Sequence, residues 1–162
     1  MSSQDNLKIY SSNGYLVFED FIVREKIRFV AIEDILIYHV GETYNNQINF
    51  YLSQPIVYEN INGSWWSKLL YKLFLKTHSD RLTIEEGYSD ENISLILSVL
   101  QENLIGVSAE NDLQNSIFWK TVDQGYEVPR AKVVYSKNGS GLVDVLKKYG
   151  KMIDKKDIKN NH

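Results

Sequence analysis

The sequence predicts an α+β fold, in which a run of short antiparallel strands is followed by amphipathic helices. Three observations predict it. Tyrosine and β-branched residues are plentiful in the first half of the chain and favour strands there. Residues 90–104 carry apolar side chains at helical spacing. The hydrophobic fraction of 43% and the aromatic fraction of 12%, in 162 residues, supply a core for one domain with an extension.

The first predicted element is a β-hairpin. Residues 7–10 and 15–18 read as its strands, and Asn13-Gly14 lies between them. Asparagine and glycine tolerate the positive φ angles that a tight hairpin turn requires. The sequence therefore predicts an antiparallel pair at the start of the domain.

The next predicted strand covers residues 21–31, where basic and apolar side chains alternate. Ile27 and Phe29 face one side of the strand. The basic side chains face the other side: Arg24, Lys26 and Arg28. Such a basic stripe is suited to contact a phosphate or a carboxylate-rich partner. The alternative is a solvated sheet face, on which cross-strand acids lie opposite the bases.

The remaining elements follow from alternation, turn residues and caps. Strands are predicted at residues 35–40, 47–52 and 81–86, with a turn at 41–46 and a loop at 58–63. Ser89 is suited to cap the helix at 90–104, and Gly106 to end it. The apolar face of that helix consists of Ile93, Ile96, Leu97 and Leu100.

This succession of strands with a closing helix resembles a bacterial pleckstrin-homology-like domain over residues 7–104. The resemblance implies a bent antiparallel sheet or partial barrel, closed at one end by the C-terminal helix. It also implies binding of phospholipid heads, peptides or proteins rather than catalysis. The first hairpin turn, Ser11-Ser12-Asn13-Gly14, lacks the basic residues of lipid-binding members. The helix predicted near Trp65 would be an insertion in that family pattern.

Residues 1–105 are thus expected to form the main domain, and residues 106–162 a helical and extended C-terminal extension packed on it. A helix is predicted at 110–123 and extended chain at 127–135. A turn at 137–141, with Ser140 as the cap, is expected to open a last helix. The apolar face of this helix is predicted to be Leu142, Val145, Leu146 and Tyr149. The final residues are expected to fray.

The stretch at 64–76, SWWSKLLYKLFLK, carries the main candidate binding residues. Three lysines recur every four residues and share one face of the predicted helix: Lys68, Lys72 and Lys76. The opposite face carries Trp65, Trp66, Leu69, Leu70, Leu73 and Phe74. Such a helix can anchor a protein partner, lie on an anionic membrane surface, or pack on its own sheet with solvated lysines.

The sequence offers no motif for a reaction. Without cysteine, thiolate chemistry, disulfides and cysteine metal sites are excluded. The histidines, His39, His78 and His162, do not have the spacing of metal ligands, and we expect no metal and no cofactor. A catalytic site that assembles only in space remains an alternative.

Charge and hydropathy narrow the expected partners. The net charge of −3 opposes general binding to nucleic acid, which depends on neutralising phosphates. We expect no secretory signal and no membrane span, and therefore a cytoplasmic protein. The leading hypothesis is a non-catalytic module that binds another protein, of the kind found in inhibitors and in bacterial immunity proteins that block a toxin. Peripheral membrane binding is the second hypothesis, and a homo-oligomer is compatible with both.

Overall fold

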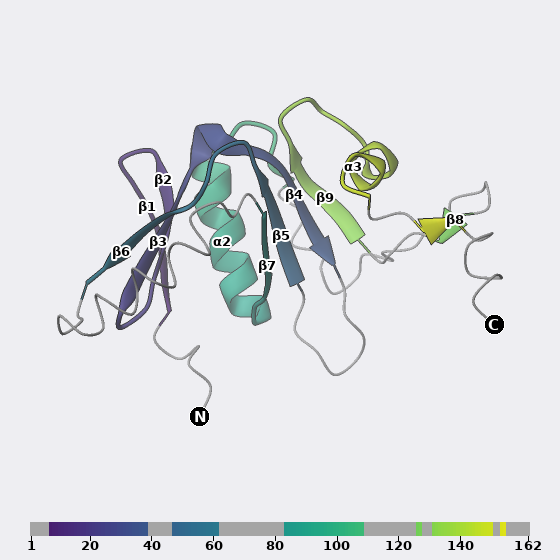
Figure 1. The fold of residues 1–162 in the computed structure, drawn as a ribbon. Helices are drawn as coiled ribbons and strands as arrows, with labels where there is room; N and C mark the ends of the chain where they lie inside the picture. The colour runs from purple at the N-terminus through teal and green to yellow at the C-terminus, as the bar shows by residue number, and fades with distance from the viewer. Residues whose placement is uncertain are drawn as a thin grey trace, which may run out of the picture.

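The computed structural model describes residues 7–38, 47–61, 83–108, 126–127, 131–150 and 153–154. These residues form an α+β fold built on two four-stranded antiparallel sheets, which do not close into a barrel (Figure 1). The first sheet has the order β1-β2-β3-β6. Its strands are β1 (Lys8–Ser12), β2 (Tyr15–Glu19), β3 (Val23–Arg28) and β6 (Val57–Asn60).

The second sheet has the order β7-β5-β4-β9. Its strands are β4 (Ile32–Tyr38), β5 (Gln47–Leu52), β7 (Thr83–Gly87) and β9 (Ala131–Ser136). A short ladder joins β8 (Tyr126–Glu127) to β10 (Ile153–Asp154). The described helices are the 3₁₀ turn η1 (Phe29–Ala31), α2 (Asp90–Asn103) and α3 (Leu142–Lys148).

The predicted first hairpin is confirmed. Asn13 and Gly14 form the two-residue turn between β1 and β2, with φ angles of 49° and 80°. Only a residue that tolerates the left-handed region fits there, which is why Asn-Gly marks this turn in the sequence. The turn fixes the register of the hairpin from Ser12 opposite Tyr15 to Lys8 opposite Glu19.

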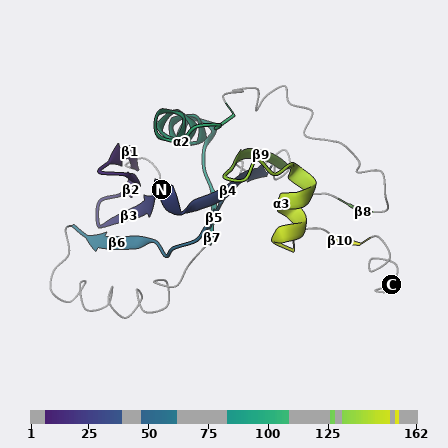
Figure 2. The same cartoon turned by 90° about the horizontal axis from the view of Figure 1, so that it is seen from above.

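The core lies between the inner faces of the two sheets and α2. Phe18 and Ile27 of the first sheet meet Ile35 and Phe50 of the second in one buried cluster. The predicted apolar face of α2 fills the same cluster: Ile93, Ile96, Leu97 and Leu100. The oxygen of Ser89 accepts a hydrogen bond from the amide of Asn92, which confirms the predicted cap. Figures 1 and 2 together show α2 on the side of the molecule where β1 and β9 lie, next to the space between the two sheets.

A second apolar layer covers the far side of the second sheet. Figure 2, seen from above, shows α3 on the side of the second sheet away from the first. Val145 and Leu146 of α3 pack on Leu36, Tyr51 and Ala131. β9 hydrogen-bonds to β4, so part of the predicted extension is an edge strand of the second sheet. The division of the chain at residue 105 stays a prediction.

Three local predictions are wrong. The predicted loop at 58–63 includes most of strand β6, which pairs with β3. The strand predicted at 21–31 is shorter, because β3 ends at Arg28 and η1 follows. The N-cap residue of α3 is Gly141 and not the predicted Ser140, so no side chain caps this helix. The predicted turn at 41–46 and the helices predicted at 64–76 and 110–123 lie outside the described residues.

Candidate functional site

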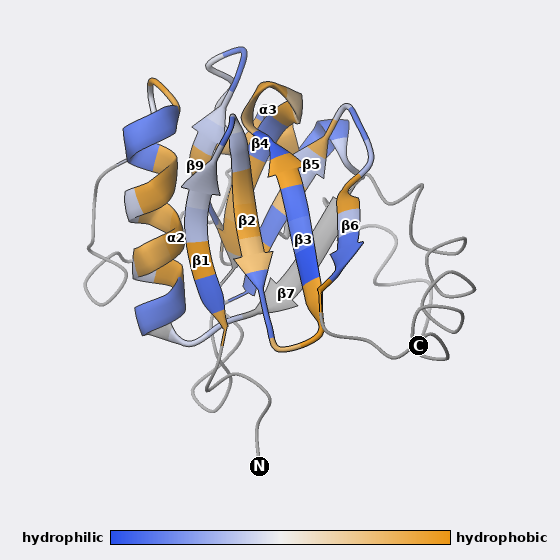
Figure 3. Ribbon diagram, turned by 90° about the vertical axis from the view of Figure 1, so that its left-hand side faces the viewer, coloured by the Kyte–Doolittle hydropathy of each residue, from blue (hydrophilic) through white to orange (hydrophobic). Residues whose placement is uncertain are grey.

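The candidate site is the face of the first sheet that points away from the core, which we call the open face. Ile9, Leu16, Phe18 and Ile27 point into the core, and the residues that alternate with them point outward. The open face consists of Lys8, Tyr10, Ser12, Tyr15, Val17, Glu19, Arg24, Lys26, Arg28, Val57 and Glu59. Among the described residues, no helix crosses this face, which Figure 3 presents to the viewer.

One row across the open face alternates in charge. The strand register aligns Lys8, Glu19, Arg24 and Glu59. The Lys8 ammonium lies 3.5 Å from a Glu19 oxygen, and the Arg24 guanidinium lies 2.7 Å from Glu19 and 3.3 Å from Glu59. Each carboxylate therefore has a cation on the neighbouring strand. These are the opposite-charge cross-strand pairs that stabilise a half-exposed sheet.

Glu19 is the most heavily bonded acid in this row. One of its oxygens accepts hydrogen bonds at 2.7 Å from the Tyr10 hydroxyl and from Arg24 Nε. These bonds, the Tyr10 bond first, hold the pKa of Glu19 below its ordinary value. Burial, and then the bond to Glu19, raise the pKa of Tyr10. Glu19 is consequently a charged, fixed part of the surface at neutral pH.

The other end of the open face is basic and aromatic. The Lys26 ammonium bonds to Glu59 and lies 5.1 Å from the centre of the Tyr15 ring. The guanidinium carbon of Arg28 lies 5.6 Å from the same ring, and Arg28 Nε donates to the Tyr15 hydroxyl at 2.9 Å. The hydrogen bond from Lys26, with a smaller contribution from Arg24, holds the pKa of Glu59 below its ordinary value. Tyr15 is thus held by two cations.

The structure brings the three predicted basic residues, Arg24, Lys26 and Arg28, onto one face and gives each a different set of partners. Arg24 and Lys26 pair with acids, whereas Arg28 bonds to Tyr15 and to the Gln54 side-chain oxygen. Whether the stripe contacts an anion stays a prediction. The other predicted binding residues lie outside the described residues: Trp65, Trp66, Lys68, Leu69, Lys72, Phe74 and Lys76.

Sequence reasoning missed the aromatic and acidic residues of the open face, which are Tyr10, Tyr15, Glu19 and Glu59. For Tyr10, Tyr15 and Glu19 the sequence does contain a signal. A two-residue Asn-Gly turn sets the hairpin register, which places these three on the face of Lys8 and Ser12. No local signal places the fourth, because Glu59 pairs with Arg24 from 35 residues away.

A second polar cluster ties α3 to the second sheet. Asp34 is only 2% exposed and accepts hydrogen bonds from Lys148 Nζ at 2.7 Å and the Tyr149 hydroxyl at 2.5 Å. The Tyr149 ring stacks on Tyr51, with ring centres 3.7 Å apart. Burial, then the bond to Asp34, raise the pKa of Tyr149 to about 12. The cluster joins α3 to strands β4 and β5, and we assign it to stability.

Neither cluster has the composition of a metal centre. Within the described ranges, no group of three or more histidine, aspartate or glutamate side chains is placed to hold a metal ion. None of the described helices combines the length and apolar character needed to cross a membrane. Comparisons with protein-family models, curated proteins and solved structures gave no match.

Proposed function

We propose that this protein is a non-catalytic module that binds another protein through the open face. One observation carries the proposal. Of the broad sheet faces in the described part of the chain, the inner two share a core with α2 and the outer face of the second sheet carries α3. The open face carries no described helix and presents aromatic and charged side chains to the surface.

The open face has the physical character of a recognition surface. Its side chains are fixed by cross-strand bonds before any partner arrives, which reduces the entropy cost of binding. Val17, at its centre, is only 1% exposed, so the longer side chains around it pack rather than move freely. Tyrosine and arginine, both present here, are enriched among residues that carry binding energy.

The charge of the open face supports a protein partner. It carries four basic side chains and two acidic ones, whereas the whole chain has a net charge of −3. The surface is therefore locally positive on an acidic protein. Complementary charge steers association and selects partners more than it adds raw affinity. An inhibitor of the immunity-protein kind would use such a surface, because it needs shape and charge complementarity rather than a reactive centre.

We also propose that the fold is pleckstrin-homology-like. The support is architectural: within the described residues seven strands precede α2, and α2 packs against the core that the two antiparallel sheets share. A module of this kind presents sheet faces and loops to its partners. The lysine-edged helix predicted at 64–76, with Trp65 and Trp66, belongs to the same proposal as a second contact.

The test is affinity capture from a lysate of the source cells, quantified by mass spectrometry. We compare the wild-type protein with a double variant of the open face, Tyr15→Ala with Val57→Glu. The matched control is Leu95→Glu, which places the same new charge on a half-exposed residue of α2. A further arm, Trp65→Ala with Trp66→Ala, tests the predicted helix.

The proposal predicts a protein that the wild type and Leu95→Glu retain and that the open-face variant loses at least tenfold. Circular dichroism must show that the variants remain folded. A partner retained equally by all variants, or no reproducible partner, would overturn the proposal. Loss only in the Trp65 arm would move the binding surface to that helix.

A further inference from the structure

Two arginines on the same face of β3 differ in how much of their bonding capacity is used. Arg24 donates through Nε to Glu19 and through Nη1 to Glu59, and its Nη2 lies 2.7 Å from Glu19. All three of its nitrogens therefore contact carboxylates. Its side chain is 32% exposed. Arg24 belongs to the internal bonding of the surface and has little left to offer a partner.

Arg28, by contrast, uses only part of its hydrogen-bonding capacity. It is exposed, donates through Nε to the Tyr15 hydroxyl and makes one long bond of 3.5 Å from Nη1 to Gln54. Neither acceptor is charged. An arginine has five N–H donors, so three of those of Arg28 have no acceptor among the described residues. They include both donors of Nη2.

The guanidinium of Arg28 is nonetheless held in place. The Tyr15 ring lies beside it and also contacts Lys26, which is fixed by its bond to Glu59. Three of the four bases on the open face share its two acids, so one of the two remaining positive charges lies on Arg28, at this end. The cation is ordered, and no carboxylate of the described residues neutralises it; in this state an arginine binds a carboxylate with least reorganisation.

We propose that Arg28, with Lys26 and Tyr15, receives an acidic segment of the partner protein, with one of its carboxylates bound to the free N–H donors of the Arg28 guanidinium. This inference rests on the proposed function and adds the chemistry of the partner. The occupant follows from charge complementarity: a locally positive surface, with its unneutralised arginine at one end, fits a chain segment rich in aspartate or glutamate.

The neighbouring row of the open face favours a protein over a membrane. Glu59 is 39% exposed and lies one strand from Arg24 on the same face. A flat anionic bilayer laid on the face would press its headgroups against this carboxylate and compete with it for Arg24 and Lys26. A peptide can be positioned on Arg28 while avoiding Glu59, so the surface selects for a narrow acidic ligand.

The test uses a synthetic peptide of eight glutamates as the probe, with eight glutamines as the neutral comparison. Binding is followed by NMR through the backbone amides and the Nε–H signal of Arg28, at low and raised salt. Arg28→Gln removes the charge, and Arg28→Lys keeps the charge but not the planar fork. The control is Lys147→Gln on α3, which removes one exposed positive charge far from the open face.

We expect the glutamate peptide to shift the Arg28 Nε–H signal and the β2 and β3 amides. Its affinity should fall about tenfold in Arg28→Gln, as expected for loss of a charge-assisted bond. It should fall by a smaller factor in Arg28→Lys and change less than twofold in Lys147→Gln. Raised salt should weaken binding.

Three outcomes would overturn the inference. They are no binding of the glutamate peptide, equal binding of the glutamine peptide, or equal affinity in Arg28→Gln and Lys147→Gln. Binding to phosphatidylserine vesicles that depends on Arg28, without peptide binding, would assign the site to membranes instead. If the lysate capture succeeds and the peptide fails, only the partner chemistry is wrong. If the peptide binds and the capture fails, the proposed function is wrong.

Discussion

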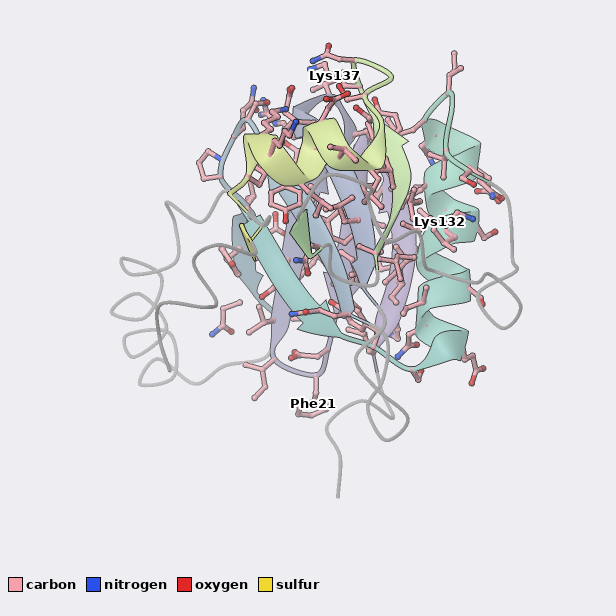
Figure 4. All side chains as sticks on the ribbon, turned by 90° about the vertical axis from the view of Figure 1, so that its right-hand side faces the viewer. Phe21, Lys132 and Lys137 are labelled. Carbon is pink, nitrogen blue, oxygen red and sulfur yellow. The ribbon has the colours of Figure 1, made fainter. Side chains whose placement is uncertain are left out.

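The two sheets share one core, but their outer faces differ. The outer face of the second sheet presents Leu36, Tyr51 and Ala131, and α3 covers it. The outer face of the first sheet carries a charge-alternating row and a basic, aromatic end, and no described helix lies on it. Figure 4 shows α3 lying across the second sheet, and Figure 3 shows the open face.

This difference follows from the change in free energy when each face is covered and removed from water. An apolar sheet face is stabilised by burial, at about 25 cal/mol for each Å² removed from solvent. A face whose charges are already paired across strands gains little from being covered, because its ions must then be desolvated. The second sheet therefore acquires α3 from within the chain. In the described part of the chain, the outer face of the first sheet carries no such helix, as the proposed binding surface requires.

The largest expected effect lies under α3. Leu146 is fully buried, and Leu146→Ala should lower the free energy of unfolding by about 2–5 kcal/mol through lost burial and a residual cavity. Val57→Ala, on the open face, should cost less than about 1 kcal/mol because Val57 is 38% exposed. Urea denaturation measures both. Equal losses of unfolding free energy in the two variants would contradict the proposed difference between the two faces.

The second effect concerns the anchor of α3. Asp34→Ala leaves Tyr149 and Lys148 without their carboxylate acceptor and should cost about 1–3 kcal/mol. Most of this loss should come from the Tyr149 bond, because water screens the half-exposed Lys148. Tyr149→Phe alone, measured by the same denaturation, should reproduce most of this loss of stability. If Lys148→Met lowered the free energy of unfolding and Tyr149→Phe did not, the assignment of the loss to the Tyr149 bond would be wrong.

The same anchor predicts a pH dependence. Burial alone would raise the pKa of Asp34, but hydrogen bonds from Lys148, Tyr149 and Ser136 outweigh it and hold that pKa below its ordinary value of 3.8. The unfolded state then binds the proton more tightly, so stability is present above pH 3.8 and is lost as the pH falls through the lowered folded value.

Asp34→Asn should therefore unfold less steeply with acid than the wild type does, as followed by circular dichroism from pH 6 to pH 2. Glu19 and Glu59, whose pKa values are also lowered, are present in both proteins and contribute equally to their acid unfolding. The difference between the two acid profiles therefore reports on Asp34. The same acid profile in Asp34→Asn and wild type would show that the Asp34 anchor contributes nothing to the acid transition.

The smallest effect is expected on the open face. Glu59→Gln removes an exposed acid from the pairs with Arg24 and Lys26 and should change the free energy of unfolding by less than about 1 kcal/mol. Sodium chloride at about 1 M should remove the difference, because its Debye length is roughly 3 Å. A large, salt-independent loss would mean that the row is a structural element like the α3 anchor.

Features set by neighbouring residues could be predicted from the sequence. The Asn13-Gly14 turn, the outward alternation of Arg24, Lys26 and Arg28, and the Ser89 cap all depend on local backbone and side-chain preferences. The outline of an α+β fold follows from such features, because each element is amphipathic at its own period.

Features set by distant residues could not be predicted. Asp34 meets Tyr149 across 115 positions, and its burial depends on α3 packing over β4. β6 is four residues of mostly polar side chains, and it becomes a strand because β3 offers it an edge. The contrast between the two outer faces could not be predicted either, because it arises only when the sheets are assembled.

The measurement that tests the central claim most directly is oxidative footprinting of the captured complex. Hydroxyl radicals label exposed aromatic and aliphatic side chains, and Tyr15 and Leu95 provide one reporter on the open face and one on α2. We predict that the partner lowers the labelling rate of Tyr15 severalfold and leaves Leu95 unchanged. Undiminished labelling of Tyr15, with protection elsewhere, would show that the partner binds a different surface.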